Sequence, residues 1–177
     1  MSYKHRLSKL INNFVAFQIG WLACAMFHDG RAVVIVAGLL TWLYFAEPWS
    51  KVRIRVTIQI ALLGILMDIC LTYLGIYYFP APSMYIPFWL VLLWFLFAST
   101  LSVSLHWMMS KSLYAFIGGA IIGPAAYFGG HQFEAMEIVE PSYYFVISIV
   151  WGCMMIVFSI LHRKQPNNRI VLSRVSD

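Results

Sequence analysis

The sequence predicts an all-α fold: a single polytopic membrane domain built as a bundle of six transmembrane helices, with the N- and C-termini cytoplasmic. The composition is the first observation behind this prediction. Of the 177 residues, 62% are apolar and only 11% are charged, whereas soluble domains carry about 25% charged residues. The spacing of the apolar runs and the sidedness of the charges are the other two observations.

Six apolar runs come close to the roughly 20 residues that a helix needs to cross a bilayer. They lie at about residues 11–28, 31–46, 56–79, 85–109, 112–130 and 143–161. Pro48 closes the second run and Pro80 the third, because proline disfavours helical backbone in the residue before it. Residues 163–177 are polar, and we expect them to form a cytoplasmic tail.

The charged residues support this number of helices. With the N-terminus in the cytoplasm, all but Arg31 of the 12 Lys and Arg residues fall on the cytoplasmic side, as the positive-inside rule requires. One helix more or fewer would scramble this pattern. The outer loops carry carboxylates instead, namely Asp29, Glu134, Glu137 and Glu140.

The basic residues lie in short clusters outside the apolar runs. Such clusters are typical of segments that contact anionic lipid headgroups, here at the cytoplasmic face of the lipid bilayer. They lack the interleaved aromatic residues of an RNA-binding surface, so we expect no nucleic-acid partner. Most aromatic residues, including Tyr77, lie near predicted helix ends, as in aromatic belts. Trp94 and Trp151 lie deeper, and we expect them to pack between helices.

An ionisable residue, Asp68, lies within the third apolar run, where a carboxylate costs roughly 2.5–3.5 kcal/mol on insertion scales. Ala61, Gly64, Asp68, Thr72 and Gly75 recur every three or four residues, so they share one face of a helix. The small residues favour close approach of a neighbouring helix. We therefore expect Asp68 to face the bundle interior. Two interpretations remain open: a carboxyl group that handles a proton or a substrate, and a hydrogen-bonded packing residue.

Three polar residues of the fourth run are candidate partners of Asp68. Thr100 and Ser104 are one helical turn apart. Serine and threonine in membrane helices also bond to their own backbone carbonyls, which is the alternative interpretation. His106 lies near the cytoplasmic end and could serve as a proton acceptor, an anchor or an interfacial residue.

Glu47 ends the second run on the predicted cytoplasmic side, beside a basic stretch that begins at Lys51. One interpretation is a carboxylate at the access to an internal site. The other is a loop ion pair with the nearby basic residues, which contributes little to stability if it is exposed.

The fifth run is irregular. Gly119 and Gly123 form a GxxxG pair, the pattern of a close-packing face in apolar helices. Pro124 lacks an N–H and crowds the carbonyl of Ala120, so we expect a kink there. That freed carbonyl must be satisfied by a side chain or by water. A packing kink and a broken-helix binding site are both consistent with this pattern.

The sequence predicts no metal and no cofactor. HExxH, nucleophile-elbow, P-loop and dinucleotide-binding patterns are missing. His28, Asp29, His131, Glu134 and Glu137 could act as metal ligands only if two outer loops met. No nucleophile–base pair has convincing spacing, which argues against an enzyme acting alone.

Several segments together resemble a family of small bacterial inner-membrane proteins, the domain of unknown function 2878. The resemblance rests on Glu47, Asp68 and residues 87–94, 97–101 and 119–127, and it extends over nearly the whole chain. It implies a bacterial inner-membrane location and association with membrane-lipid modifying enzymes. It implies no catalytic residue.

Three functional hypotheses follow. In the first, the protein binds or moves a hydrophobic or amphipathic small molecule, such as a lipid, in an intramembrane cavity around Asp68. In the second, it is an accessory or catalytic subunit in membrane-lipid modification. In the third, it is a non-catalytic scaffold in which Asp68 sets helix packing. Six short helices would need a homodimer to enclose a transport pathway.

Overall fold

The computed structural model describes residues 3–46, 49–80 and 86–164. Within these ranges the fold is all-α, as predicted, with six α-helices. They are α1 (Tyr3–Phe27), α2 (Gly30–Ala46), α3 (Lys51–Tyr73), α4 (Phe88–Leu101), α5 (Ser112–Gln132) and α6 (Tyr143–Arg163). A short 3-10 helix, η1 (Met108–Ser110), precedes α5, and two short strands, β1 (Tyr77–Tyr78) and β2 (Glu137–Ile138), pair antiparallel. Glu47 and residues 165–177 of the predicted tail lie outside the described residues.

Four of the described helices, α1, α3, α5 and α6, are long and apolar enough to cross a membrane, by length and composition. The other two, α2 and α4, have 17 and 14 residues. At about 1.5 Å per residue they extend only about 25 and 21 Å, less than the roughly 30 Å of a hydrocarbon core. Leu62 and Leu66 of α3 are exposed on its outward side.

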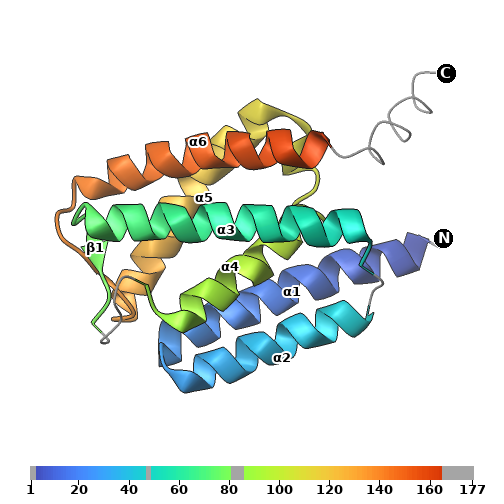
Figure 1. Ribbon diagram of the computed structural model, residues 1–177, viewed down its shortest axis with the longest axis horizontal. Helices are drawn as coiled ribbons and strands as arrows, with labels where there is room; N and C mark the ends of the chain where they lie inside the picture. The colour runs from blue at the N-terminus through green and yellow to red at the C-terminus, as the bar shows by residue number, and fades with distance from the viewer. Residues whose placement is uncertain (1–2, 47–48, 81–85, 165–177) are drawn as a thin grey trace.

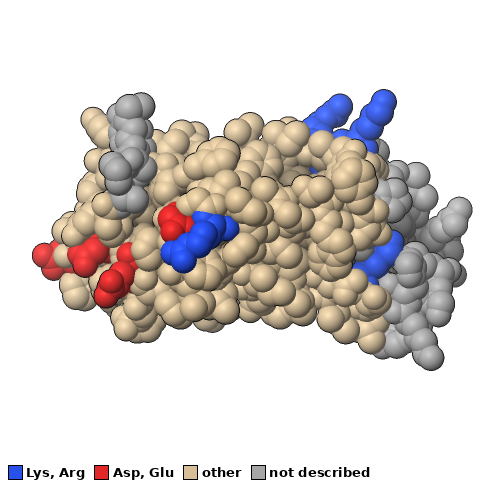
Figure 2. Space-filling view, turned by 90° about the horizontal axis from the view of Figure 1, so that it is seen from below, with Lys and Arg blue, Asp and Glu red and all other residues tan. Residues whose placement is uncertain are grey.

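In Figure 1, α3 and α6 run along the long axis of the molecule, α1 and α2 are tilted slightly from it, and α5 crosses it steeply behind α3. α5 packs on α6, α3 packs on α4, and α1 packs on both α2 and α4. The start of α1 and the end of α6 lie at the same end of the bundle. On the face shown in Figure 2, most Asp and Glu side chains lie toward one end and most Lys and Arg side chains toward the other. We call these the acidic end and the basic end.

The third helix ends earlier than predicted, at Tyr73 instead of residue 79. Gly75 has φ +72°, a left-handed conformation that favours glycine and ends helices. The Ile76 N–H donates to the carbonyl of Leu71, and the chain then reverses into β1. The prediction that Gly75 shares a helical face with Asp68 is therefore wrong.

The fourth helix is also shorter than predicted and ends at Leu101 instead of residue 109. The Ser99 and Thr100 hydroxyls donate to the carbonyls of Leu96 (2.7 Å) and Phe97 (2.6 Å). Such bonds compete with regular helix. Turns follow as far as η1, so the prediction of one helical face for Thr100 and Ser104 is wrong.

The fifth helix continues through Pro124 without a break. The Ser148 hydroxyl on α6 donates to the Ala120 carbonyl at 2.6 Å, and this is the carbonyl that Pro124 cannot bond. Gly119 and Gly123 lie against Met155 and Trp151 of α6, with no room for a β carbon. The segment around Pro124 is thus held by close packing and one side-chain donor.

We expect Ser148→Ala to lower the free energy of unfolding by about 1–2 kcal/mol, because it leaves the Ala120 carbonyl without a donor. Adding Pro124→Ala should recover part of that loss, because alanine restores the backbone N–H. Chemical unfolding in detergent micelles measures both effects. Thr41→Ala is the matched control, since the Thr41 hydroxyl donates to the Ala37 carbonyl of its own helix. Equal losses in the two single variants would contradict this account.

Candidate functional site

Asp68 is fully buried, with 0% of its surface exposed. It lies five residues before the end of α3, about 7.5 Å along the helix axis. The carboxyl group is therefore closer to the acidic end of the bundle than its central place in the apolar run indicated. It faces the bundle interior, as the small-residue pattern predicted.

Three neutral donors bond the Asp68 carboxyl group, and each comes from a different element. The Tyr77 hydroxyl from β1 donates to Oδ1 at 2.7 Å, and the Trp94 indole N–H from α4 donates to Oδ2 at 2.7 Å. The Tyr127 hydroxyl from α5 also donates to Oδ1. Buried carboxyl groups are stable only when such partners replace water. We call these four residues the Asp68 cluster.

Two glycines set the position of the tryptophans beside Asp68. Gly64, one turn before Asp68, has no room for a β carbon because the Trp94 ring lies on its backbone. Trp94 thus presents its N–H to Asp68 on the next turn. Trp151 of α6 stacks on Trp94, with ring centroids 5.3 Å apart at 18°. Gly123 of α5 makes room for Trp151 in the same way.

Tyr77 reaches Asp68 only because the chain reverses after α3. The Gly75 turn places β1 beside the end of the helix, and β1 pairs with β2 through Tyr77 and Ile138. The Val139 N–H donates to the Ile76 carbonyl at 3.2 Å and continues this pairing. Tyr77 is fully buried at 0% exposed. β1 therefore covers the Asp68 cluster on the side that faces the acidic end of the bundle.

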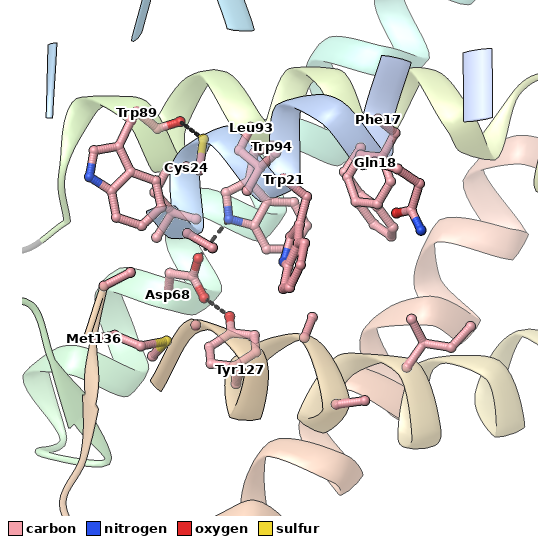
Figure 3. A pocket seen from close by; sticks show the side chains of 18 of the residues that line it. Phe17, Gln18, Trp21, Cys24, Asp68, Trp89, Leu93, Trp94, Tyr127 and Met136 are labelled. Carbon is pink, nitrogen blue, oxygen red and sulfur yellow. Dashed lines mark hydrogen bonds between the residues drawn. The ribbon is translucent and has the colours of Figure 1, made fainter. Parts of the chain in front are cut away.

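A cavity of about 420 Å³ lies beside the Asp68 cluster (Figure 3). Residues of α1, α4 and α5 form most of its lining, together with Asp68, Trp151, Phe79 and the segment before β2. Its lining is mainly apolar and includes four tryptophans, namely Trp21, Trp89, Trp94 and Trp151. The cavity is partly open to the outside.

α1 and α5 flank this cavity. Trp21 of α1 reaches α5, where its ring lies on Gly129 so closely that a β carbon there would be 2.8 Å from it. Phe14 on α1 and Ile122 on α5 also line the cavity and are 46% and 53% exposed. The cavity therefore communicates with the apolar outer surface between these two helices.

The structure brings only one predicted partner, Thr100, to the same cavity as Asp68. Its hydroxyl, however, donates to the Phe97 carbonyl of its own helix. Thr72, one turn from Asp68, does not bond it. The Thr72 hydroxyl is buried and makes no hydrogen bond within the part of the chain that the structure describes.

The other two predicted partners lie elsewhere. The Ser104 hydroxyl donates to Asn13 Oδ1 at 2.8 Å, and Asn13 in turn donates to Ser99. This network joins α1 to α4. His106 Nδ1 lies 2.8 Å from His162 Nε2 on α6. Neither Ser104 nor His106 is among the residues that line the cavity.

Sequence reasoning missed the three donors of the Asp68 cluster. Trp94 was expected to pack between helices, and Tyr77 was placed in an aromatic belt. The available signal was chemical, since buried tyrosine and tryptophan need a hydrogen-bond partner and Asp68 needs donors. Gly64, one turn from Asp68, could also have indicated a large ring at that position.

Two carboxylates of the acidic end, Asp29 and Glu137, are engaged in local interactions. Asp29 forms an ion pair with Arg31 at 2.9 Å, and the Arg31 guanidinium holds the pKa of Asp29 below its usual range. Glu137 accepts a hydrogen bond from the Tyr78 hydroxyl at 2.7 Å. Among the described residues, no group of three or more His, Cys, Asp or Glu side chains could hold a metal ion.

A family comparison bears on the resemblance noted in the sequence. The sequence model of the family described as Protein of unknown function (DUF2878) matches residues 10–157. The chain belongs to this family. The resemblance noted in the sequence is therefore confirmed, and the family description assigns no activity. No curated protein and no solved structure matches the chain.

We expect Asp68→Asn to fold with a loss of no more than about 1 kcal/mol. Its amide oxygen can accept from Trp94, and its NH₂ can donate to the tyrosine oxygens, because hydroxyls both donate and accept. Asp68→Leu should lower the free energy of unfolding by about 3–5 kcal/mol, because three buried donors lose their acceptor. Unfolding in detergent micelles measures both.

Thr72→Val is the matched control for these variants. It removes a buried hydroxyl one turn from Asp68 that makes no hydrogen bond in the described structure, so it should leave the stability unchanged or raise it slightly. An Asp68→Leu variant as stable as Thr72→Val would show that the three hydrogen bonds contribute nothing.

Proposed function

We propose that this chain is an integral protein of the bacterial inner membrane that binds or moves a hydrophobic or amphipathic small molecule in the cavity beside Asp68. The observation that carries the proposal is the cavity itself. Its volume of about 420 Å³ lies in the range of small-molecule sites, which runs from about 300 to 1,000 Å³. Its lining combines apolar walls with one buried, firmly oriented carboxyl group, the usual composition of such sites.

The ligand reaches the cavity from the side in this proposal, between α1 and α5. Phe14 and Ile122 continue the apolar outer surface into the cavity. In a bilayer this opening faces the hydrocarbon core, where an apolar molecule is already concentrated. The contact of Trp21 with Gly129 crosses the same gap, so this side chain sets the width of the opening.

The proposed topology has six transmembrane helices and both termini in the cytoplasm. It is supported by the opposite charges at the two ends of the bundle (Figure 2) and by four helices of spanning length. α2 and α4 are shorter than a bilayer core, so the bilayer must thin locally or the turns after α4 must lie within it. In the same proposal, the basic end of the bundle contacts anionic lipid headgroups.

The second hypothesis, a subunit in membrane-lipid modification, has less support at this cavity. No histidine is among the described residues that line it, so the cavity lacks a nucleophile–base pair of the usual kind. The scaffold hypothesis can be distinguished by measuring ligand binding, because a scaffold does not need a cavity that a ligand can enter. The homodimer remains a prediction.

Filling the cavity tests the proposal. Ala126 lies on the cavity face of α5, so Ala126→Phe should exclude a ligand while the protein still folds. Native mass spectrometry of protein purified from its own membranes should detect a bound small molecule in the wild type and not in this variant. Ile121→Phe is the control, since Ile121 is exposed on α5 and does not line the cavity.

The same bound molecules in both variants, or none in the wild type, would contradict the proposed binding function. A bound molecule that appears as a substrate–product pair would favour lipid modification instead.

The topology has its own test. A reporter fused after the C-terminus should read cytoplasmic, because the positive-inside rule assigns that end to the inside. A reporter inserted between Phe27 and Gly30, the bounds of α1 and α2, should read periplasmic. The reverse pattern, or the same side for both, would contradict the six-helix topology.

A further inference from the structure

The described lining of the cavity includes one acidic side chain and no basic one. Asp68 is the one ionisable carboxyl group among the described residues that line it, and no Lys, Arg or His is among them. The three donors of the Asp68 cluster are neutral, since they are two hydroxyls and an indole N–H. Buried carboxylates are generally balanced by a cation. In the described part of this protein, no cationic side chain bonds Asp68.

The aromatic lining also favours a positively charged ligand. The cavity includes four tryptophan side chains, among them Trp21 from α1 and Trp94 and Trp151 from the interior. Aromatic faces attract cations through their quadrupole, and tryptophan does so most strongly. An anion lacks this attraction to the ring faces and is repelled by the Asp68 carboxylate.

The acidic end of the molecule adds negative charge beside one part of the cavity lining. The turn before β2 lines the cavity with Ala135 and Met136. The exposed residues Glu134, in the same turn, and Glu137, the first residue of β2, lie on either side of them in the sequence. Clefts beside charges of one sign concentrate ligands of the opposite sign. Arg31, at the start of α2, is paired with Asp29.

We infer that the cavity selects an amphipathic cation, a molecule with one onium centre, such as a protonated amine, attached to an apolar body. This inference rests on the proposed function. The cationic end lies toward Asp68 and Trp94, near the acidic end of the bundle. The apolar body extends along α1 toward Phe17 and Phe14, so the two chemically different parts of the cavity receive the two parts of the ligand.

Two ions of nearly the same size and shape but opposite charge test this inference. Tetraphenylphosphonium is the cationic probe and tetraphenylborate the anionic probe. Binding of each to the full-length protein in detergent micelles is measured by isothermal titration calorimetry, and empty micelles are titrated to subtract partitioning. We expect the cation to bind at least about tenfold more tightly than the anion, given one close charge in a low-dielectric site.

Three variants show whether the probes bind in the cavity and whether Asp68 causes the difference in their affinities. Asp68→Asn should weaken binding of the cation by about tenfold or more and leave binding of the anion unchanged or stronger. Ala126→Phe should abolish binding of both probes, and Ile121→Phe should bind them as the wild type does. Thermal unfolding of each variant confirms that it is folded before titration.

The possible failures are distinguishable. Equal affinity for the two probes, or unchanged cation binding in Asp68→Asn, overturns the inferred charge selectivity, while loss of binding in Ala126→Phe still supports the cavity as a binding site. Cation binding that survives in Ala126→Phe places the probe outside the cavity and overturns the inference. Binding of neither probe to the wild type also overturns it, and the molecules retained by the purified protein then test the proposed function separately.

Discussion

A single buried carboxyl group connects the parts of this bundle. Asp68 on α3 accepts hydrogen bonds from β1, α4 and α5, through Tyr77, Trp94 and Tyr127. In an apolar interior an unpartnered carboxyl group is strongly destabilising, so each of these elements must be in place at once. The early end of α3, the Gly75 turn and the small β1–β2 sheet are all needed to deliver the Tyr77 hydroxyl.

The cavity is a consequence of how the helices are grouped. α5 packs closely on α6 because Gly119 and Gly123 admit the side chains of α6, and α1 packs on α2 and α4. Between these groups, the Asp68 cluster and the Trp94–Trp151 stack form the interior contact. Trp21 on Gly129 makes another contact near the surface. Space remains between α1 and α5, and it is bounded by aromatic rings.

The sequence contained enough information for the helices and for the direction in which Asp68 faces. Apolar run length and charge sidedness predict the helices, and the spacing of small residues predicts the buried face of α3. Pro124 predicted that the Ala120 carbonyl needs a donor, and the structure supplies it from Ser148. These features depend on neighbours along the chain, so periodicity and local chemistry are sufficient.

The partners of Asp68 could not be predicted in the same way. Trp94 and Tyr127 are distant in sequence, and their approach depends on how α3, α4 and α5 pack. Tyr77 comes close only because Gly75 ends the helix. Thr72 and Ser104 were chosen by helical spacing, but the first hydroxyl has no partner in the described structure and the second bonds Asn13. Spacing along one helix says little about contacts between helices.

A double-mutant cycle between Trp94 and Asp68 tests the central claim most directly. Asp68→Leu leaves the Trp94 N–H without an acceptor, and Trp94→Phe removes that N–H. The double variant should therefore be more stable than the sum of the single losses predicts, by about 1–3 kcal/mol. A matched cycle of Trp94→Phe with Thr72→Val should be additive. Additivity within about 0.3 kcal/mol in the Asp68 cycle would contradict the claim that this hydrogen bond organises the bundle.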